Sequence, residues 1–416
     1  MERHKLRFAL LGVYMVTLLS MTDRASAQGI ERESLSGENV AAEMRQSGVD
    51  LPYNLRLGPV TVRAEFDATA NFNDNIGLTK DDKMADLILT PTAILHARWQ
   101  VSDLNTILFN IGIGYETYAF HSQYNSLLLS PDSEVSFNFF VGDVAFNFHD
   151  NFSYQQDPTQ IAQLSNTVRL TRWQNDVGLS ARWDLNDIVI ELAYDHANLW
   201  VSESAYSYLT NASDTFSPKL TYHVDSSIDA GLNMSISDVR YQQSFQNDYN
   251  NLSVGPFVTA KISDNLSVQA QFGGYFTDYS QGGGNGDSEN IASYYGSAGV
   301  NHRINESMNE TATIGREFLP GLTSNFTERV YANYTFTWQA TKSFNSGANF
   351  FWENLTDSAA AFSENSDRYG FGLDLGYDLN EHARLSFNYQ YLLKNADPSY
   401  LSYDQNSVTF GARYQF

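Results

Sequence analysis

The last ten residues of the chain alternate strictly between two kinds of side chain. Apolar or small residues occupy every second position back from the end, and polar residues or glycine lie between them, in the order Ser407-Val408-Thr409-Phe410-Gly411-Ala412-Arg413-Tyr414-Gln415-Phe416. Successive side chains of a strand point to opposite faces, so this segment would present one face to hydrocarbon and the other to water. The same alternation recurs along most of the chain, which predicts an all-β fold, a transmembrane antiparallel up-and-down β-barrel.

The start of the chain has the layout of a secretory signal peptide. Three basic residues precede an apolar run, and the small-residue cleavage site Ala25-Ser26-Ala27 follows. The run of about a dozen residues is too short for a comfortable membrane-spanning helix. We therefore predict three parts of the chain: a signal peptide at 1–27, a short periplasmic leader at 28–58 and an outer-membrane β-barrel at 59–416.

Tight turns and long polar connections alternate along the predicted barrel. The tight turns lie near Asp103, Asp143, Asp187, Ser226, Asn265, Glu306, Lys342 and Glu381. Short turns at one end and long loops at the other are typical of bacterial outer-membrane barrels, whose long loops face outside. The turn pattern predicts about 18 strands, with 16 as the alternative.

Two features disturb the alternation. Pro91, Pro218 and Pro256 fall within predicted strands, where each removes a backbone donor, so β-bulges are expected there. Arg316 falls on the apolar face beside Ile314, which leaves the strand around 308–318 poorly patterned.

The segment Asn71-Phe72-Asn73-Asp74-Asn75-Ile76 closes the first predicted barrel strand. It resembles the aromatic-x-Asp-Asn-aliphatic segment of outer-membrane β-barrel porins found with exopolysaccharide biosynthesis operons. The resemblance implies an 18-stranded barrel that passes polysaccharide across the outer membrane. The ending Tyr414-x-Phe416 is similar to the signal by which the barrel-assembly machinery recognises its clients. The alternative interpretation of Asp74-Asn75 is simply a turn at a strand end.

The alternation also assigns charged side chains to the water-facing side of the wall. The lumen-facing candidates are Arg63, Glu65, Asp67, Arg98, Glu116, Arg182, Asp184, Lys261, Arg303, Asp374, Asp378, Arg384 and Arg413. Acids and bases are nearly balanced, so neutral or zwitterionic solutes suit this wall better than a polyanion. Alternatively, these charges pair with one another and brace the wall. Inward aromatic residues such as Tyr118, Tyr275 and Phe351 would stack on sugar rings or merely fill space.

The composition excludes several other functions. The net charge is −23, which argues against a nucleic-acid binder, and the absence of cysteine excludes disulfides and thiolate metal sites. The histidines show no ligand or catalytic spacing. His121 and His149 could face the outside, but no Gly-x-Ser-x-Gly segment accompanies them. We predict no enzyme activity and no catalytic, metal or cofactor site.

The sequence therefore predicts a passive channel or export conduit in the outer membrane of a Gram-negative cell, with saccharide or exopolysaccharide cargo as the resemblance implies. The expected partners are outer-membrane lipid and lipopolysaccharide, the barrel-assembly machinery and polysaccharide-synthesis proteins. Two other functions stay open. One is a structural or adhesive surface barrel, which would not conduct ions. The other is a hydrophobic-solute transporter in which residues 28–58 form a small hatch.

Overall fold

The computed structural model describes residues 53–358 and 363–416. The predicted signal peptide and most of the predicted leader lie outside these residues. The strands are β1 (Leu55–Leu57), β2 (Val60–Asn73), β3 (Asp86–Gln100), β4 (Thr106–Tyr118), β5 (Ser126–Leu129), β6 (Glu134–Val141), β7 (Val144–Gln155), β8 (Arg172–Asp184), β9 (Ile188–Val201), β10 (Asn211–His223), β11 (Ile228–Tyr241), β12 (Tyr249–Ser263), β13 (Leu266–Tyr279), β14 (Ile291–Asn305), β15 (Met308–Pro320), β16 (Phe326–Gln339), β17 (Phe344–Asp357), β18 (Asn365–Asp378), β19 (Ala383–Asp397) and β20 (Tyr403–Gln415). The 3₁₀ turns are η1 (Ser122–Tyr124), η2 (Ser204–Leu209) and η3 (Ser399–Leu401). No helix in this part of the chain is long and apolar enough to cross a membrane.

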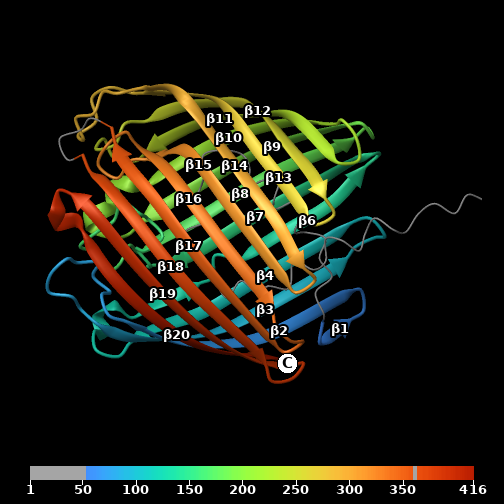
Figure 1. Cartoon of the computed structure of the whole chain (residues 1–416), viewed down its shortest axis with the longest axis horizontal. Helices are drawn as coiled ribbons and strands as arrows, with labels where there is room; N and C mark the ends of the chain where they lie inside the picture. The colour runs from blue at the N-terminus through green and yellow to red at the C-terminus, as the bar shows by residue number, and fades with distance from the viewer. Residues whose placement is uncertain (1–52, 359–362) are drawn as a thin grey trace, which may run out of the picture.

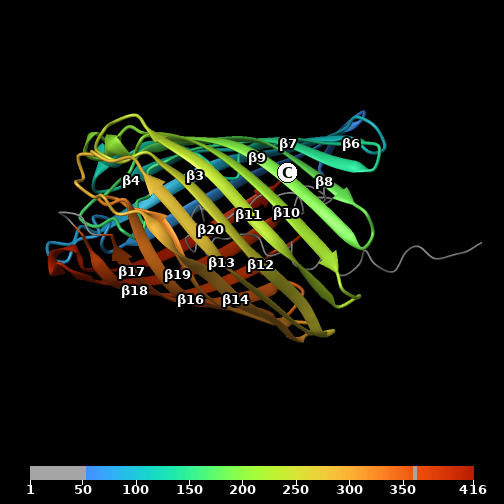
Figure 2. The same cartoon turned by 90° about the horizontal axis from the view of Figure 1, so that it is seen from above.

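The sheet closes on itself because β2 pairs with β20, from Glu65 opposite Gln415 to Asn73 opposite Ser407. All other wall strands pair antiparallel with their neighbours in the chain. β5 and β6 share one wall position, since both lie between β4 and β7. β1 is not counted as a wall strand, because it pairs only with the first three residues of β2. The wall therefore has 18 strands, as the turn pattern predicts, and the alternative of 16 is wrong. Figures 1 and 2 show these strands running obliquely around the closed barrel.

A break in one wall strand was not predicted from the alternation. Residues 130–133 separate β5 from β6 and contain Pro131. Hydrogen bonds seal this break on both sides: the Ser130 amide donates to the Gly112 carbonyl (2.8 Å) and the Phe152 amide donates to the Ser133 carbonyl (3.0 Å). The wall therefore stays continuous around an inserted bulge.

The prediction of bulges at the three prolines is wrong. Pro91, Pro218 and Pro256 each keep their pairing with one neighbouring strand and interrupt the ladder on the other side for two residues. The register is the same on both sides of each interruption. The missing N–H of each proline therefore interrupts the backbone hydrogen bonds locally, but no extra residue is inserted into the strand. Register shifts occur instead beside short turns, close to Ser263 and Asn305.

Arg316 lies where β14 and β15 separate. Their pairing ends at Gly296 opposite Arg316, although β14 continues beyond that point. The guanidinium of Arg316 makes a two-pronged ion pair with Glu328 (2.7 and 2.9 Å), donates to the Tyr294 carbonyl and lies 4.3 Å from the Tyr294 ring centroid. Arg316 thus links β14, β15 and β16 through its side chain where β14 and β15 are no longer paired by backbone hydrogen bonds. This position explains why a charged residue lies beside the exposed Ile314.

The outer face of the barrel is apolar, as the alternation predicts. On β20 and the chain end, Phe410, Tyr414 and Phe416 are exposed, whereas Gly411 between them is buried. Three exposed tryptophans stand close to short turns, as an interfacial aromatic belt requires. They are Trp99, Trp183 and Trp338.

Deleting Phe416 is expected to reduce the folded fraction at least about twofold, since a phenylalanine side chain contributes about 1.5–3 kcal/mol when it leaves water. Its amide donates to the Ala64 carbonyl (3.1 Å) at the closing seam, and its ring meets the Tyr414 ring edge-on at 5.2 Å. Heat-modifiable protein in outer-membrane fractions measures the effect. Gln415→Ala is the control and should assemble normally. Equal folded fractions for the deletion and the control would contradict the prediction.

Candidate functional site

The long connection between β7 and β8, residues 156–171, crosses the interior of the barrel; we name it the crossing loop. Its Gln163 side chain donates to the Thr327 hydroxyl of β16 (3.4 Å), and its Ser165 hydroxyl donates to the Leu401 carbonyl of η3 (2.6 Å). At least five wall strands separate these partners from β7 and β8 in either direction around the ring. Leu164 at the centre of the loop is completely buried. The loop therefore lies inside the barrel and reaches its opposite wall.

Local turns fold the crossing loop compactly. The Asp157 carboxylate accepts hydrogen bonds from the Thr159 amide (2.9 Å) and hydroxyl (2.7 Å), which starts a turn after the strand. The Ile161 amide then donates to the Pro158 carbonyl and the Leu164 amide to the Ile161 carbonyl. Consecutive turns of this kind satisfy the backbone of a segment that has no strand partner.

A buried lysine anchors the crossing loop to β19. Lys394 is fully buried, and its ammonium group donates to the Gln163 carbonyl (2.9 Å) and the Ser165 hydroxyl (3.0 Å). The same group lies 2.7 Å from the Glu364 carboxylate. A buried cation is stable only when it is paired and hydrogen-bonded, and these three contacts provide both.

A chain of alternating charges lies beside this anchor. Arg329 joins Glu317 (2.7 Å) to Glu353 (2.6 Å), and Glu353 joins Arg329 to Arg368 (2.7 Å). Glu353 and Arg368 are essentially inaccessible to solvent. Arg368 also donates weakly to the Thr159 carbonyl (3.5 Å). Strands β15 to β18 therefore meet the crossing loop through a buried, charge-balanced network.

The opposite side of the crossing loop packs against the connection between β9 and β10. Leu164 and Leu170 form one buried cluster with Leu209, and Tyr208 packs against it. Burial raises the pKa of Tyr208 to about 12, so this phenol is neutral at physiological pH. Uncharged contacts on one side and charged anchors on the other hold the loop in place.

Four predicted lumen-facing residues come together where the barrel closes. Asp67 of β2 lies opposite Arg413 of β20, with an ion-pair distance of 3.1 Å. Glu65, which is only 4% exposed, lies 3.8 Å from Arg413 and pairs with Arg63. This cluster joins the first and last wall strands, a role closer to bracing than to solute binding.

The remaining lumen-facing candidates form ion pairs or hydrogen bonds, except Lys261, which is exposed at the end of β12. Two sets are ion pairs: Arg182 lies 3.8 Å from both Asp184 and Glu191, and Asp378 pairs with Arg384 at 3.2 Å. The others form hydrogen bonds: Arg303 donates to the Asn265 side chain, Arg98 donates to Gln100, Asp374 accepts from Asn388, and Glu116 accepts from Gln156. Most of these contacts lie within the wall. Glu116 differs, because Gln156 belongs to the crossing loop.

The inward aromatic residues pack against other side chains and do not line an open channel. Tyr118 and Tyr275 are each less than a tenth exposed. Tyr275 stacks on Phe318 with ring centroids 5.0 Å apart, and the Arg368 guanidinium lies 5.7 Å from the Phe351 ring. Because other side chains already cover these faces, the rings are poorly placed to stack on a passing sugar.

The segment that resembles polysaccharide-associated porins serves as a turn. The Asn73 side chain accepts the Asn75 amide (2.8 Å), and Asp74 accepts two hydrogen bonds of 2.7 Å from the backbone and side chain of Asn406. Asn75 is fully buried and donates to the Asp404 carbonyl (2.8 Å). These contacts tie the first long loop to β20, which accounts for Asp74-Asn75 without any cargo.

His149 does not face the outside of the barrel. His149 is 3% exposed and lies within β7, on the face opposite exposed Phe148. The register of β7, β8 and β9 brings it together with Asp176 and Asp195. The sequence spacing could not show this cluster, because each residue comes from a different strand. By contrast, His121 lies in a connecting loop and pairs with Asp86 at 2.7 Å.

The position of the crossing loop inside the barrel is not evident from the turn pattern. Residues 157–166 read as an ordinary polar connection, and no charge pattern marks their anchors. A usable signal does exist: Ile161, Leu164 and Leu170 place large apolar side chains in a connection that would otherwise face water. An apolar loop of this kind is expected to be buried.

Comparison with solved structures shows the same fold in outer-membrane channels. OccK2 (OpdF) from Pseudomonas aeruginosa, in complex with glucuronate, has a TM-score of 0.51 and 10% identity, covering 85% of this chain and 98% of that one. A BenF-like porin from Pseudomonas fluorescens Pf-5 has a TM-score of 0.51 and 8% identity, covering 86% and 100%. OpdK from Pseudomonas aeruginosa, with vanillate, has a TM-score of 0.50 and 7% identity, covering 85% and 99%. The chain therefore shares the closed 18-strand antiparallel barrel of outer-membrane porins.

Sequence comparisons add no closer assignment. No protein-family model matches the chain. No curated protein matches it either.

Proposed function

We propose that this protein is an outer-membrane diffusion channel that passes small, neutral or zwitterionic polar solutes. The observation that carries the proposal is the crossing loop, which buried polar contacts hold across the interior of an 18-strand barrel. A ring of this size otherwise leaves an aqueous channel. A loop held inside it sets an upper limit on solute size.

The charged residues of the wall suggest weak charge selectivity. Cations and carboxylates are paired at the closing seam and in the network around Glu353. Paired charges produce a weaker field in the lumen than a row of one sign would. Neither anions nor cations should therefore be strongly favoured.

A polysaccharide conduit is the weaker candidate. A polymer would have to displace the crossing loop, and the Lys394 and Ser165 contacts oppose that movement. Monosaccharides remain within the proposed solute class. Small carboxylates deserve direct comparison, because solved neighbours of this fold hold vanillate and glucuronate.

Planar-bilayer recordings and liposome swelling test the proposal on the refolded protein. Glycine and glucose should enter liposomes, raffinose should be excluded, and reversal potentials in salt gradients should stay close to zero. A barrel without conductance would contradict a channel and favour the structural or adhesive alternative. Raffinose entering as fast as glucose would contradict the constriction. Strong preference for glucuronate or vanillate over glucose would contradict the proposed solute class.

A further inference from the structure

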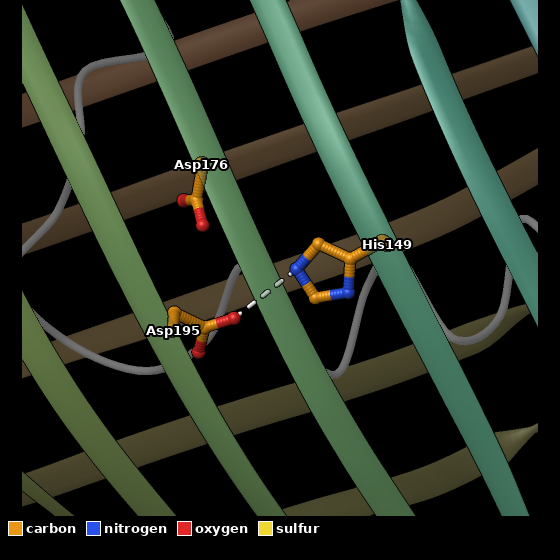
Figure 3. Close-up of side chains that lie close together, drawn as sticks. All are labelled: His149, Asp176 and Asp195. Atoms are coloured by element: carbon orange, nitrogen blue, oxygen red, sulfur yellow. Dashed lines mark ion pairs between the residues drawn. The ribbon is translucent and has the colours of Figure 1, made fainter.

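Three neighbouring wall strands bring one histidine and two aspartates together on their inward face. His149 of β7 lies in register with Gly178 of β8, which lies in register with Asp195 of β9. Asp176 is two residues from Gly178 on the same strand, so it shares this face. One imidazole nitrogen and one oxygen from each carboxylate all lie within 4.8 Å of one another. Figure 3 shows the three side chains converging.

Gly178 permits this convergence. A Cβ at this position would lie 2.1 Å from Asp195 Oδ1 and 2.6 Å from His149 Nε2, which is closer than any side chain tolerates. His149 and Asp195 therefore meet across the middle strand, with Nε2 and Oδ1 3.1 Å apart. Ligand atoms bound to one tetrahedral Zn²⁺ at about 2.0–2.1 Å are themselves about 3.3–3.4 Å apart. The 3.1 Å between His149 Nε2 and Asp195 Oδ1 is close to that spacing, and the nearest Asp176 oxygen lies within 4.8 Å of both atoms.

The hydrogen bonds around His149 orient its ring for metal binding. Nδ1 lies 3.0 Å from the Asn147 side-chain oxygen, and the Asn147 amide nitrogen donates to Asn138 (2.8 Å). Because the Asn147 oxygen can only accept, Nδ1 must carry the hydrogen. Nε2 lies on the side of the ring that faces Asp195, so it is the nitrogen that would bind an ion held between the carboxylates. A histidine ligand in a metal site usually has this second hydrogen bond.

Charge balance favours a divalent ion at this position. Asp195 is 7% exposed, and its Oδ2 accepts no hydrogen bond within the described part of the chain. A buried carboxylate needs compensation. A divalent ion held between the carboxylates of Asp195 and Asp176 would bring positive charge next to this oxygen.

We propose that His149, Asp176 and Asp195 bind a divalent transition-metal ion, for which Zn²⁺ is the appropriate probe. Imidazole and carboxylate donors suit Zn²⁺, whereas Mg²⁺ and Ca²⁺ prefer oxygen ligands alone. Three protein ligands leave a coordination position for water or for a donor atom of a solute. The ion would also tie β7, β8 and β9 together on the inner side of the wall.

Isothermal titration of the refolded, chelator-treated barrel with Zn²⁺ tests this site. We expect one ion per chain, with at least about 100-fold weaker binding in His149→Gln and Asp195→Asn, since the loss of a residue that only hydrogen-bonds a metal ligand already costs about 10–100-fold. Asn147→Ala should weaken binding about 10–100-fold for that reason. His223→Gln is the matched control, because His223 pairs with Asp229 at 2.6 Å elsewhere in the same barrel. This variant should bind Zn²⁺ as tightly as the unaltered barrel.

X-ray absorption on the unaltered protein keeps the test independent of variant folding. The expected Zn²⁺ environment has one imidazole and oxygen donors at about 2.0–2.1 Å. Heat-modifiability identifies which variants are folded. Absence of stoichiometric binding, an environment without imidazole, or unchanged binding in folded His149→Gln would each overturn the proposal.

Discussion

Replacement of residues 158–168 by a Gly-Ser-Gly linker is expected to raise the single-channel conductance at least about threefold, because an 18-strand ring without an inward loop leaves a wide aqueous channel. The replaced segment includes Leu164, which is completely buried, and both crossing-loop groups that contact Lys394. Its removal should therefore widen the narrowest part of the pore. The size limit for sugars should rise with the conductance, so raffinose should enter liposomes.

A matched control is available in the first long loop. Residues 80–82 are exposed, and Asp82 has a positive φ of 53°, which glycine adopts without strain. Replacing these three residues by Gly-Ser-Gly should leave the conductance unchanged. Heat-modifiability would establish that both variants are folded. If the folded crossing-loop variant kept the original conductance and sugar cut-off, the loop would not be the constriction.

The wall of this barrel could be predicted because its pattern is local. A period of two fixes which face of each strand is apolar, and turn residues fix where strands end. The closing segment from Phe410 to Phe416 illustrates this, since its exposed residues follow the alternation directly. The β-bulges expected at the prolines do not form, because Pro218 removes a backbone donor while the strand register continues unchanged past it.

The contents of the barrel could not be predicted in the same way. The partners of Ser165 and Gln163 lie more than 150 residues away in the chain. No short-range period reports contacts at that separation. The cluster of His149 with Asp195 likewise depends on the exact register of three strands, and a shift of one residue would point either side chain outward.

Glu353→Gln is expected to lower the free energy of unfolding by about 3–5 kcal/mol, the usual cost of breaking a buried ion pair. Glu353 has no solvent exposure and accepts from Arg329 (2.6 Å) and Arg368 (2.7 Å). Glutamine keeps the shape but leaves two neighbouring guanidinium groups with one neutral amide between them. Urea unfolding of the barrel in lipid vesicles measures the loss.

Two further variants separate the buried charge from a general effect of mutation. Asp378→Asn breaks the more exposed pair with Arg384 and should cost about 0–1 kcal/mol. Combining Glu353→Gln with Arg368→Met removes one charge of each sign, so the double variant should be more stable than Glu353→Gln alone. Such a recovery would identify unpaired buried charge, rather than lost shape, as the cause. Equal unfolding midpoints for Glu353→Gln and the unaltered barrel would instead mean that this network does not stabilise the wall around the crossing loop.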